Sequence, residues 1–362
     1  MTASAHGSTA MPPTTSPEAA ASAPAAPVGP GRAPGQAKEL LAAACRWLAL
    51  LAALPVLAMS VIRALPAEWP VLAVQLLSFT PWLAVPATVA LVLALAGRRR
   101  WLQLTTAALL LCQLFWLFPL DAARPAAAAD AAARVELKAM NINAEFGQAD
   151  AARIVQLVRD NGIGLLTVQE HTEALEERLT AAGLDVLLPH RISDPTDDGA
   201  GSAVYSSQAL EQVGLIPDTP FRMPTVRLTA GQGSKAAVLE VTNVHALPPV
   251  DARVDQWRSD LAAVARLADR PGNRLLIGDF NATYDHVEFR QLLAAGPGLV
   301  DVGTASGSRL VPTWPKEGPR LPGITIDHLV TSRQVGSSGY QVHSVPGTDH
   351  AAVLATLALP AA

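Results

Sequence analysis

The chain has 362 residues and a formal net charge of −4, and half of its residues are hydrophobic. Both cysteines, Cys45 and Cys112, precede residue 134, so the part after them can contain no disulfide, cysteine-ligated zinc site or thiol nucleophile. From Arg134 onward, 26 acidic residues stand against 19 basic ones, and this balance disfavours a non-specific nucleic-acid binder, which gains affinity by neutralising phosphates.

Residues 1–39 consist mainly of small and polar residues. Ala, Pro, Ser and Thr dominate the segment, and large apolar side chains are almost absent before Leu40. Such a segment buries too little surface to offset the entropy that is lost on ordering. We therefore predict a disordered tail over residues 1–39.

Three apolar runs follow the tail, at about residues 40–62, 71–96 and 101–120. Arg46 is the only charged residue inside the first run, and the other two runs have none. Each run is long enough to cross about 30 Å of hydrocarbon at 1.5 Å per residue. Buried core helices are the alternative, but uncharged runs of this length are rare in soluble domains. We predict three transmembrane helices.

Basic residues flank the apolar runs unevenly. Arg98–Arg100 fill the loop between the second and third runs, and Arg32 and Lys38 precede the first, whereas the loop between the first and second has only Arg63. Because cytoplasmic loops are rich in Lys and Arg, we predict a multi-pass plasma-membrane protein with a cytoplasmic N-terminus. Three spans then place the C-terminal domain outside the cytoplasm, behind an Ala-rich linker over residues 121–133.

Residues 134–362 have the pattern of one globular domain. Spacing of apolar residues predicts helices over residues 149–161 and 251–270. Alternating or continuous apolar runs predict strands at residues 135–143, 163–170, 201–206, 226–229, 235–245, 274–279, 324–327, 340–345 and 352–359.

Polar residues of catalytic types lie at the ends of these predicted strands. Taken singly, residues such as Glu170, Asp327 and His245 are more often turn, cap or buried polar residues, whereas GDFN and the Asp349–His350 pair are stronger signals. Together they exceed what a solvated surface requires, and strand ends are rigid positions for a site. The candidate residues are Asn143, Glu170, His245, Asp279, Asn281, Asp327, Asp349 and His350.

The carboxylates among these candidates are suited to metal-assisted hydrolysis. Glu170 and Asp349 are the predicted ligands of Mg²⁺ or Mn²⁺, because hard cations prefer oxygen ligands. The metal would polarise a phosphoryl oxygen and offset charge in the transition state. Asp279 is the candidate for orienting or deprotonating an attacking water.

The amides and imidazoles complete this set. Asn143 and Asn281 can donate hydrogen bonds to phosphoryl oxygens or orient the water. Asp327 would hold His350 in one tautomer and make it more basic. His245 could stabilise a developing oxyanion or protonate a leaving group, so the chemistry needs no covalent intermediate.

The motifs GDFN, which contains Asp279 and Asn281, and TDH, which contains Asp349 and His350, resemble those of the endonuclease/exonuclease/phosphatase superfamily. The resemblance extends in order through the early Asn143, the QE pair, NVHA, TWP and IDH. It implies an α+β fold with two packed β-sheets flanked by helices, a four-layer αββα sandwich, here preceded by three transmembrane helices.

By the same resemblance, Glu170 is the main metal ligand and His350, oriented by Asp327, lies beside the scissile phosphate. One departure is Thr325-Ile326, where the family often has Arg before the IDH motif. Three N-terminal spans before such a domain are similar to a bacterial subgroup that includes the teicoplanin-resistance (VanJ-like) membrane proteins.

Three functions remain in competition at this point. The leading hypothesis is a membrane-anchored, metal-dependent phosphoesterase of a lipid phosphate or pyrophosphate, such as a polyprenyl carrier, with the bilayer as its partner. The alternative is an extracellular, membrane-tethered endo- or exonuclease, which the acidic charge and the lack of a basic stripe with interleaved aromatic residues disfavour. The third is a catalytically silent binding protein on the same fold.

Overall fold

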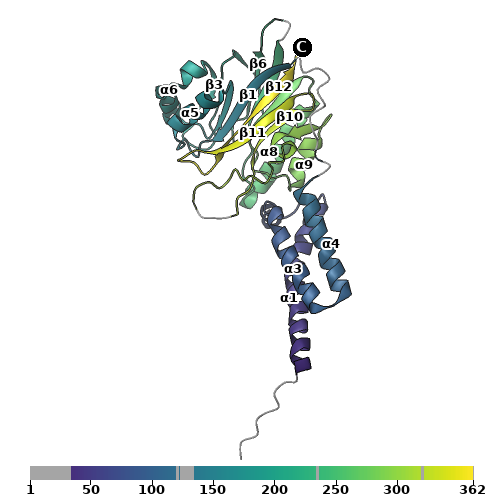
Figure 1. Ribbon diagram of the computed structural model, residues 1–362. Helices are drawn as coiled ribbons and strands as arrows, with labels where there is room; N and C mark the ends of the chain where they lie inside the picture. Colours follow the sequence, from purple (N-terminus) through teal and green to yellow (C-terminus); the bar gives the residue numbers. More distant parts are fainter. Residues whose placement is uncertain (1–33, 120–121, 123–133, 234–235, 319–321, 362) are drawn as a thin grey trace, which may run out of the picture.

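The helical segment at the N-terminus projects from a domain of strands and helices (Figure 1). The computed structural model describes residues 34–119, 122, 134–233, 236–318 and 322–361. The predicted tail up to residue 33 and the predicted linker, except Ala122, lie outside the described residues.

The N-terminal helices differ in their bounds from the three apolar runs. They are α1 (Pro34–Ala64), α2 (Val71–Leu77), the short η1 (Thr80–Leu83), α3 (Ala84–Gly97) and α4 (Arg100–Leu117). Residues 34–39, expected in the disordered tail, form the start of α1. The second run is divided between α2 and η1–α3, because Pro81 has no N–H with which to continue the helix from α2.

Among the described residues, two helical stretches are long and apolar enough to cross a membrane, Gly35–Ala64 and Thr80–Gly97. The prediction of three transmembrane helices is therefore corrected to two candidates. The helix α4 is less apolar because it contains Arg100, Gln103 and Gln113. It nevertheless packs beside α1 and α3, and the Gln113 amide donates a hydrogen bond of 2.8 Å to the Ser60 hydroxyl on α1.

Two six-stranded sheets form the centre of the domain. The first has the order β11-β12-β1-β2-β4-β3 and comprises β1 (Arg134–Asn143), β2 (Leu165–Gln169), β3 (His190–Asp194), β4 (Ser202–Ser206), β11 (Gly336–Ser344) and β12 (Ala351–Pro360). The second has the order β5-β6-β7-β8-β10-β9 and comprises β5 (Leu210–Leu215), β6 (Pro224–Ala230), β7 (Ala237–His245), β8 (Asn273–Asp279), β9 (Leu299–Asp301) and β10 (Asp327–Ser332).

Each sheet is mixed and contains one parallel pair, β1 with β2 and β7 with β8. The register brings polar strand ends into rows. His245 pairs with Asp279, and Asp279 pairs with Asp327 on the antiparallel strand β10. In the other sheet Asn143 pairs with Gln169, the residue before Glu170. Both rows lie at the same edge of the sandwich.

Three hydrophobic clusters of the domain define a four-layer α+β sandwich. One lies between the sheets and joins residues such as Leu137, Val241 and Leu329. A second packs the first sheet against α5 (Ala151–Asn161), α6 (Glu173–Ala181) and the short α7 (Leu184–Leu187). A third packs the second sheet against α8 (Val254–Ala265) and α9 (Val287–Ala294). Short helices η4 (Asp251–Arg253), η5 (Arg266–Asp269) and α10 (Val302–Ala305) complete the described elements.

The helical segment packs directly against the loop between β8 and α9, residues 280–286, here called the β8–α9 loop. Asp285 of this loop is buried and accepts bonds of 2.7 Å from Arg63 at the end of α1 and from Arg309. His286 contacts the carbonyl of Val74 on α2 at 2.9 Å, and the Val74 side chain lies in the cluster around α8 and α9. The helix α2, part of a predicted span, is therefore packed on the domain.

Candidate active site

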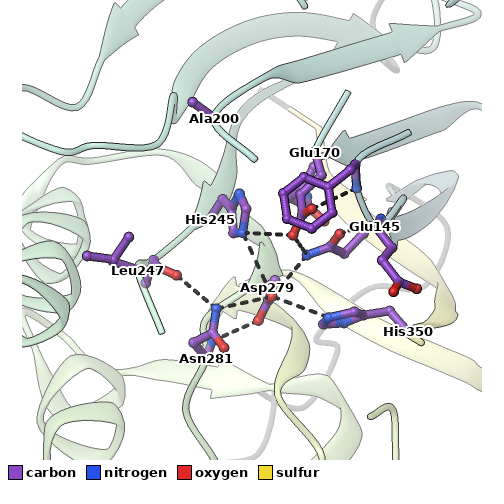
Figure 2. Close-up of polar contacts among 12 residues, drawn as sticks. Glu145, Glu170, Ala200, His245, Leu247, Asp279, Asn281 and His350 are labelled. Carbon is purple, nitrogen blue, oxygen red and sulfur yellow. Dashed lines mark hydrogen bonds and ion pairs between the residues drawn. The ribbon is translucent and has the colours of Figure 1, made fainter. Parts of the chain in front are cut away.

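Asp279 lies at the centre of the polar edge of the sandwich. Its side chain is buried, and His245, Asn281 and His350 point toward it (Figure 2). The Asp279 carboxylate accepts hydrogen bonds from the Asn281 backbone at 2.8 Å and from the Asn143 and Asn281 amides at 3.2 Å each. Burial raises the pKa of Asp279 to about 7; the charge on Asp327 acts in the same direction, while His350 and the amide bonds oppose it.

His350 lies between two carboxylates. Its Nδ1 contacts the two Asp327 oxygens at 3.0 and 3.2 Å, and its Nε2 is 3.8 Å from an oxygen of Asp279. Burial acts against a charged imidazole, but Asp327 and Asp279 outweigh it and raise the pKa of His350 to about 10. The ring is therefore held as an imidazolium at neutral pH, with Nδ1 donating to Asp327 and Nε2 available toward the site.

His245 is the second imidazole and has the opposite character. Its Nε2 lies 3.9 Å from Glu170 and 4.0 Å from Asp279, and its ring stacks on Phe221 with centroids 4.2 Å apart. Burial lowers the pKa of His245 to about 3, and the charge on His350 adds to this. Its buried Nδ1 has no hydrogen-bond partner within the described part of the chain. The site thus pairs a charged imidazole with a neutral one.

Glu170 follows β2 and is fixed by a strained turn after β1. Its carboxylate accepts bonds from the Asn143 amide at 3.1 Å and from the Phe146 backbone at 2.7 Å. Glu145, Phe146 and Glu170 all have positive φ, between 46° and 53°. Such conformations cost energy and persist where surrounding structure imposes them, which is common at functional sites. Burial raises the pKa of Glu170.

Asp349 closes the site from the other side and is the most exposed of these acids, with 28% of its side chain accessible. The Trp314 indole donates to one of its oxygens at 2.6 Å, and the other lies 3.8 Å from His350. Its backbone N–H donates to the Glu145 carboxylate at 2.6 Å. The TWP segment and the turn after β1 therefore both hold the TDH motif.

Close packing of β7 against β8 and a buried hydrogen-bond network fix the strands whose ends form the site. Gly278 has a φ of 150°, and a Cβ there would lie 1.9 Å from the carbonyl oxygen of Val244. Glycine is therefore required for β8 to lie beside β7 and to place Asp279 next to His245. Between the sheets, the Gln169 amide donates to the side chains of Asn141 on β1 and Asn243 on β7. This buried network joins the two sheets directly below the site.

The donor set fits a divalent cation. Four carboxylates, those of Glu170, Asp279, Asp327 and Asp349, surround one charged imidazole, which leaves an excess of negative charge in a largely buried site. Asp279, Asp327 and His350 place one potential ligand atom each within 4.8 Å of one another. Oxygen donors of this kind suit Mg²⁺ or Mn²⁺. An imidazolium has no free lone pair, so the carboxylates are the better ligands.

The structure brings all eight candidate residues to one edge of the sandwich. One expected detail is wrong: Asp327 does not end a strand over residues 324–327 but begins β10, and Ile324 makes only an isolated bridge with Trp314. Sequence reasoning also missed Glu145 and Phe221. Glu145 had no strand-end motif to identify it, and the position of Phe221 over His245 follows only from the packing of the loop before β6 on the site.

Comparison with known proteins agrees with this arrangement. Residues 140–350, more than half of the chain, match the Endonuclease/Exonuclease/phosphatase family. The chain belongs to this family. A comparison with curated proteins found no match.

Solved structures also match part of the chain, at low identity. An endonuclease/exonuclease/phosphatase from Beutenbergia cavernae is 18% identical, with a TM-score of 0.48. The match covers 62% of this chain and 72% of the Beutenbergia chain, and coverage is given in the same order below. Sphingomyelinase C from Streptomyces griseocarneus is 18% identical, with a TM-score of 0.43 and coverage of 61% and 99%. An AP endonuclease from Archaeoglobus fulgidus is 14% identical, with a TM-score of 0.47 and coverage of 60% and 98%.

As a member of the endonuclease/exonuclease/phosphatase family, the chain is a metal-dependent phosphoric ester hydrolase. The site described above has the parts that this chemistry requires: clustered carboxylates for a divalent cation, a buried carboxylate with a raised pKa, and a fixed imidazolium.

Proposed function

We propose that the protein is a membrane-anchored phosphoesterase that uses Mg²⁺ or Mn²⁺ to hydrolyse a phosphate or pyrophosphate ester of a membrane lipid. The observation that carries the proposal is the position of the β8–α9 loop. The loop begins directly after Asp279 and contains Asn281, and near its other end Asp285 is bonded to Arg63 of the apolar helices. The reactive centre is thereby fixed close to the anchor.

The surface of the helical segment supports a position in the bilayer. Large apolar side chains such as Leu51, Leu54, Val92 and Leu104 are exposed along it. On soluble proteins, large exposed apolar patches mark surfaces that contact a membrane or a partner protein. The acyl chains of a bilayer would cover this surface along the whole length of α1 and α3.

Tryptophan residues mark both ends of the apolar zone. Trp47 and Trp101 lie at the level of the connection between α3 and α4, because the neighbouring Arg46 donates to the Gly97 carbonyl and α4 begins at Arg100. Trp82 and Trp116 lie near the domain, because Trp82 lines a cavity with Leu310 and the Trp116 carbonyl accepts from Arg309. Residues 101 and 116 of α4 are roughly 23 Å apart at 1.5 Å per residue. Tryptophan is enriched at the two interfaces of a membrane, so this spacing supports a bilayer position for the two candidate spans, beside which α4 packs.

The basic residues support an outward-facing catalytic domain. Arg98–Arg100 connect α3 to α4 at the end of the bundle away from the domain, and the α1 N-terminus lies at the same end (Figure 1). The positive-inside rule places that end in the cytoplasm. The catalytic domain then faces the outside of the plasma membrane, as in the subgroup that includes the teicoplanin-resistance proteins.

The cation would be held by Glu170, whose carboxylate shares the Asn143 amide with Asp279. When bound, it would polarise a phosphoryl oxygen and offset charge in the transition state. Asp349, on the far side of His350, is the second candidate ligand from the sequence. The Asn143 and Asn281 amides, already aimed at Asp279, can turn their donors toward a bound phosphate.

Asp279 and His350 supply the proton chemistry. With its pKa near neutrality, Asp279 can accept a proton from the attacking water. His350 is oriented by Asp327 and presents a charged N–H to a phosphoryl oxygen. Neutral His245 faces the same space and can donate a hydrogen bond from Nε2 to the oxyanion or the leaving group.

A tethered nuclease would use the same chemistry. The formal charge of about −7 over residues 134–362 makes a polynucleotide the weaker candidate, since its backbone would be repelled.

The test is phosphate release by the full chain in detergent with Mg²⁺, from a polyprenyl pyrophosphate and, in parallel, nicking of plasmid DNA. We expect lipid turnover that falls by about 10³-fold in His350→Ala, because general acid–base groups contribute 10²–10⁴. His343→Ala is the matched control: His343 lies on the same sheet, and its ring contacts the side chain of Gln341, away from the site. DNA nicking without lipid turnover would reject the lipid substrate.

A further inference from the structure

A cavity of about 530 Å³ lies where the helical segment meets the domain. One wall comes from the helices and includes Trp82, Val85 and Leu117. The opposite wall comes from the segment before β10 and includes Leu310, Pro312 and Ile324. Its volume lies within the range of about 300–1,000 Å³ that is typical of ligand sites.

The lining of this cavity suits an apolar occupant. The charged and imidazole groups at its base are engaged by the protein: Arg309 donates to Asp285 and to the Trp116 carbonyl, and His328 contacts Asp301 and the Ala282 carbonyl. Among the described residues, no lining side chain has a buried polar atom without a partner. The cavity therefore offers apolar walls and leaves no charge for a polar ligand to neutralise.

The cavity opens beside the apolar surface of the helical segment. Trp82 and Val85 line it and are 50% and 60% exposed, and Leu310 on the other wall is 44% exposed. Trp82 is also one of the tryptophans that mark the domain side of the apolar zone. A lipid chain lying against α3 would meet this opening at the level of the membrane interface.

The cavity is also close to the reactive groups. Thr283 lines it and lies two residues after Asn281; Thr325 lines it and lies two residues before Asp327. Two residues of extended chain span at most about 7 Å. The acid cluster and the cavity are therefore separated by only a short length of these two segments, within reach of the first part of a lipid chain whose phosphate is in the site.

We propose that this junction cavity binds the apolar chain of the lipid substrate next to its phosphate and so selects lipid phosphates over soluble ones. The inference rests on the proposed function. It assigns a specificity role to Val85 and Leu310, which lie outside the acid cluster.

In the test, a tryptophan is introduced on each wall to reduce the volume of the cavity, and each substitution has a matched control. Val85→Trp is compared with Val92→Trp, since both valines lie on α3 seven residues apart and are 60% and 59% exposed, and only Val85 lines the cavity. Leu310→Trp is compared with Val311→Trp, since these neighbours are 44% and 42% exposed and only Leu310 lines it.

Two substrates are used with the full chain in detergent, a long-chain polyprenyl pyrophosphate and a water-soluble short-chain pyrophosphate. We expect Val85→Trp and Leu310→Trp to raise KM for the long-chain substrate about tenfold or more. Their kcat/KM for the short-chain substrate should stay within twofold of the parent, and both control variants should match the parent on both substrates. Equal KM values in all four variants would overturn the proposal.

A binding measurement separates this inference from the proposed function. Retention of a polyprenyl phosphate by the intact protein is measured by native mass spectrometry in a His350→Ala background, which needs no turnover. Loss of retention in Val85→Trp but not in Val92→Trp supports the cavity even if the parent hydrolyses no lipid. Equal retention in both, or retention of ordinary phospholipid in its place, contradicts the cavity as a substrate site.

Discussion

Asp279, the last residue of β8, and Asp285 in the β8–α9 loop lie six residues apart, and both are 1% exposed. Their surroundings differ. Asp279 accepts hydrogen bonds only from amide groups, and the His350 imidazolium at 3.8 Å does not outweigh burial and the neighbouring carboxylates. Asp285 lies between the guanidinium groups of Arg63 and Arg309, at 2.7 Å from each. The two carboxylates are equally buried but have different roles. Asp279 can accept a proton during the reaction, and Asp285 binds the reactive loop to the helices.

The two carboxylates also differ in what they contribute to the free energy of unfolding. A buried carboxylate beside other acids is costly until a cation or proton compensates it. A buried carboxylate between two guanidinium groups is compensated in the folded protein itself, and removing one partner leaves uncompensated charge. The same substitution at the two positions should therefore have opposite consequences.

The largest effect is expected on turnover. Asp279→Asn keeps the shape of the side chain but removes its proton-accepting oxygen, so we expect phosphate release to fall by about 10³-fold or more. Initial rates on the lipid pyrophosphate with saturating Mg²⁺ measure this. Asp255→Asn serves as the control, since Asp255 is 84% exposed and pairs with Arg258 on its own helix. A fall of less than tenfold would remove Asp279 from the proton chemistry.

The next effect is on folding. Asp285→Asn leaves Arg63 and Arg309 without their shared anion, and breaking a buried ion pair costs roughly 3–5 kcal/mol. Chemical denaturation of the detergent-solubilised chain measures the free energy of unfolding. Arg227→Gln is the control, because the Arg227 side chain is 42% exposed in its ion pairs with Glu211 and Glu240. An equal small loss in both variants would mean that the junction contributes no more than a surface pair.

A smaller effect is expected from the metal. A cation that binds the folded site at 100 times its dissociation constant stabilises the protein by about 2.7 kcal/mol. Mn²⁺ should therefore raise the unfolding temperature after chelation, and Glu170→Gln should remove most of this increase. Glu173→Gln, an exposed change in the first turn of α6, should keep it. If Asp349→Asn abolished the increase while Glu170→Gln preserved it, the assigned ligand would be wrong.

The smallest expected effect is on how the unfolding temperature depends on pH. Burial lowers the pKa of His286 below its ordinary value of 6.5, although its bond to the Val74 carbonyl opposes this. The unfolded chain takes up the proton first, so stability present above pH 6.5 is lost as the pH falls from 6.5 toward the lower folded pKa. We expect the unfolding temperature of the parent to fall more steeply between pH 6.5 and 5 than that of His286→Asn. Parallel curves would show that His286 does not couple the loop to α2 through its neutral form.

The reactive residues could be predicted from sequence because they follow local signals. GDFN and TDH adjoin strands whose apolar patterns are clear, and parallel or antiparallel pairing brings such ends to one edge. The edge strand β5 was not predicted, since its residues alternate weakly and several are exposed. The helix α6 was missed for a similar reason, because most of its residues are polar.

The junction could not be predicted because its residues are distant in the chain. Arg63 and Asp285 are 222 positions apart, and no periodicity in either segment points to the other. The apolar pattern of residues 71–96 gave one span, whereas packing of Val74 on the α8–α9 layer and the position of Pro81 divide it. Contacts between segments, which composition does not encode, decided these points.

Thermal unfolding of Asp279→Asn beside Asp285→Asn, with the metal chelated at pH 8, tests the central claim most directly. The folded-state pKa of Asp279, about 7, lies above its ordinary value of 3.8, so its ionised form weakens the metal-free fold progressively from about pH 4 to pH 7 and fully above that. We expect Asp279→Asn to raise the unfolding temperature and Asp285→Asn to lower it. A decrease in both variants would show that Asp279 is a structural carboxylate like Asp285.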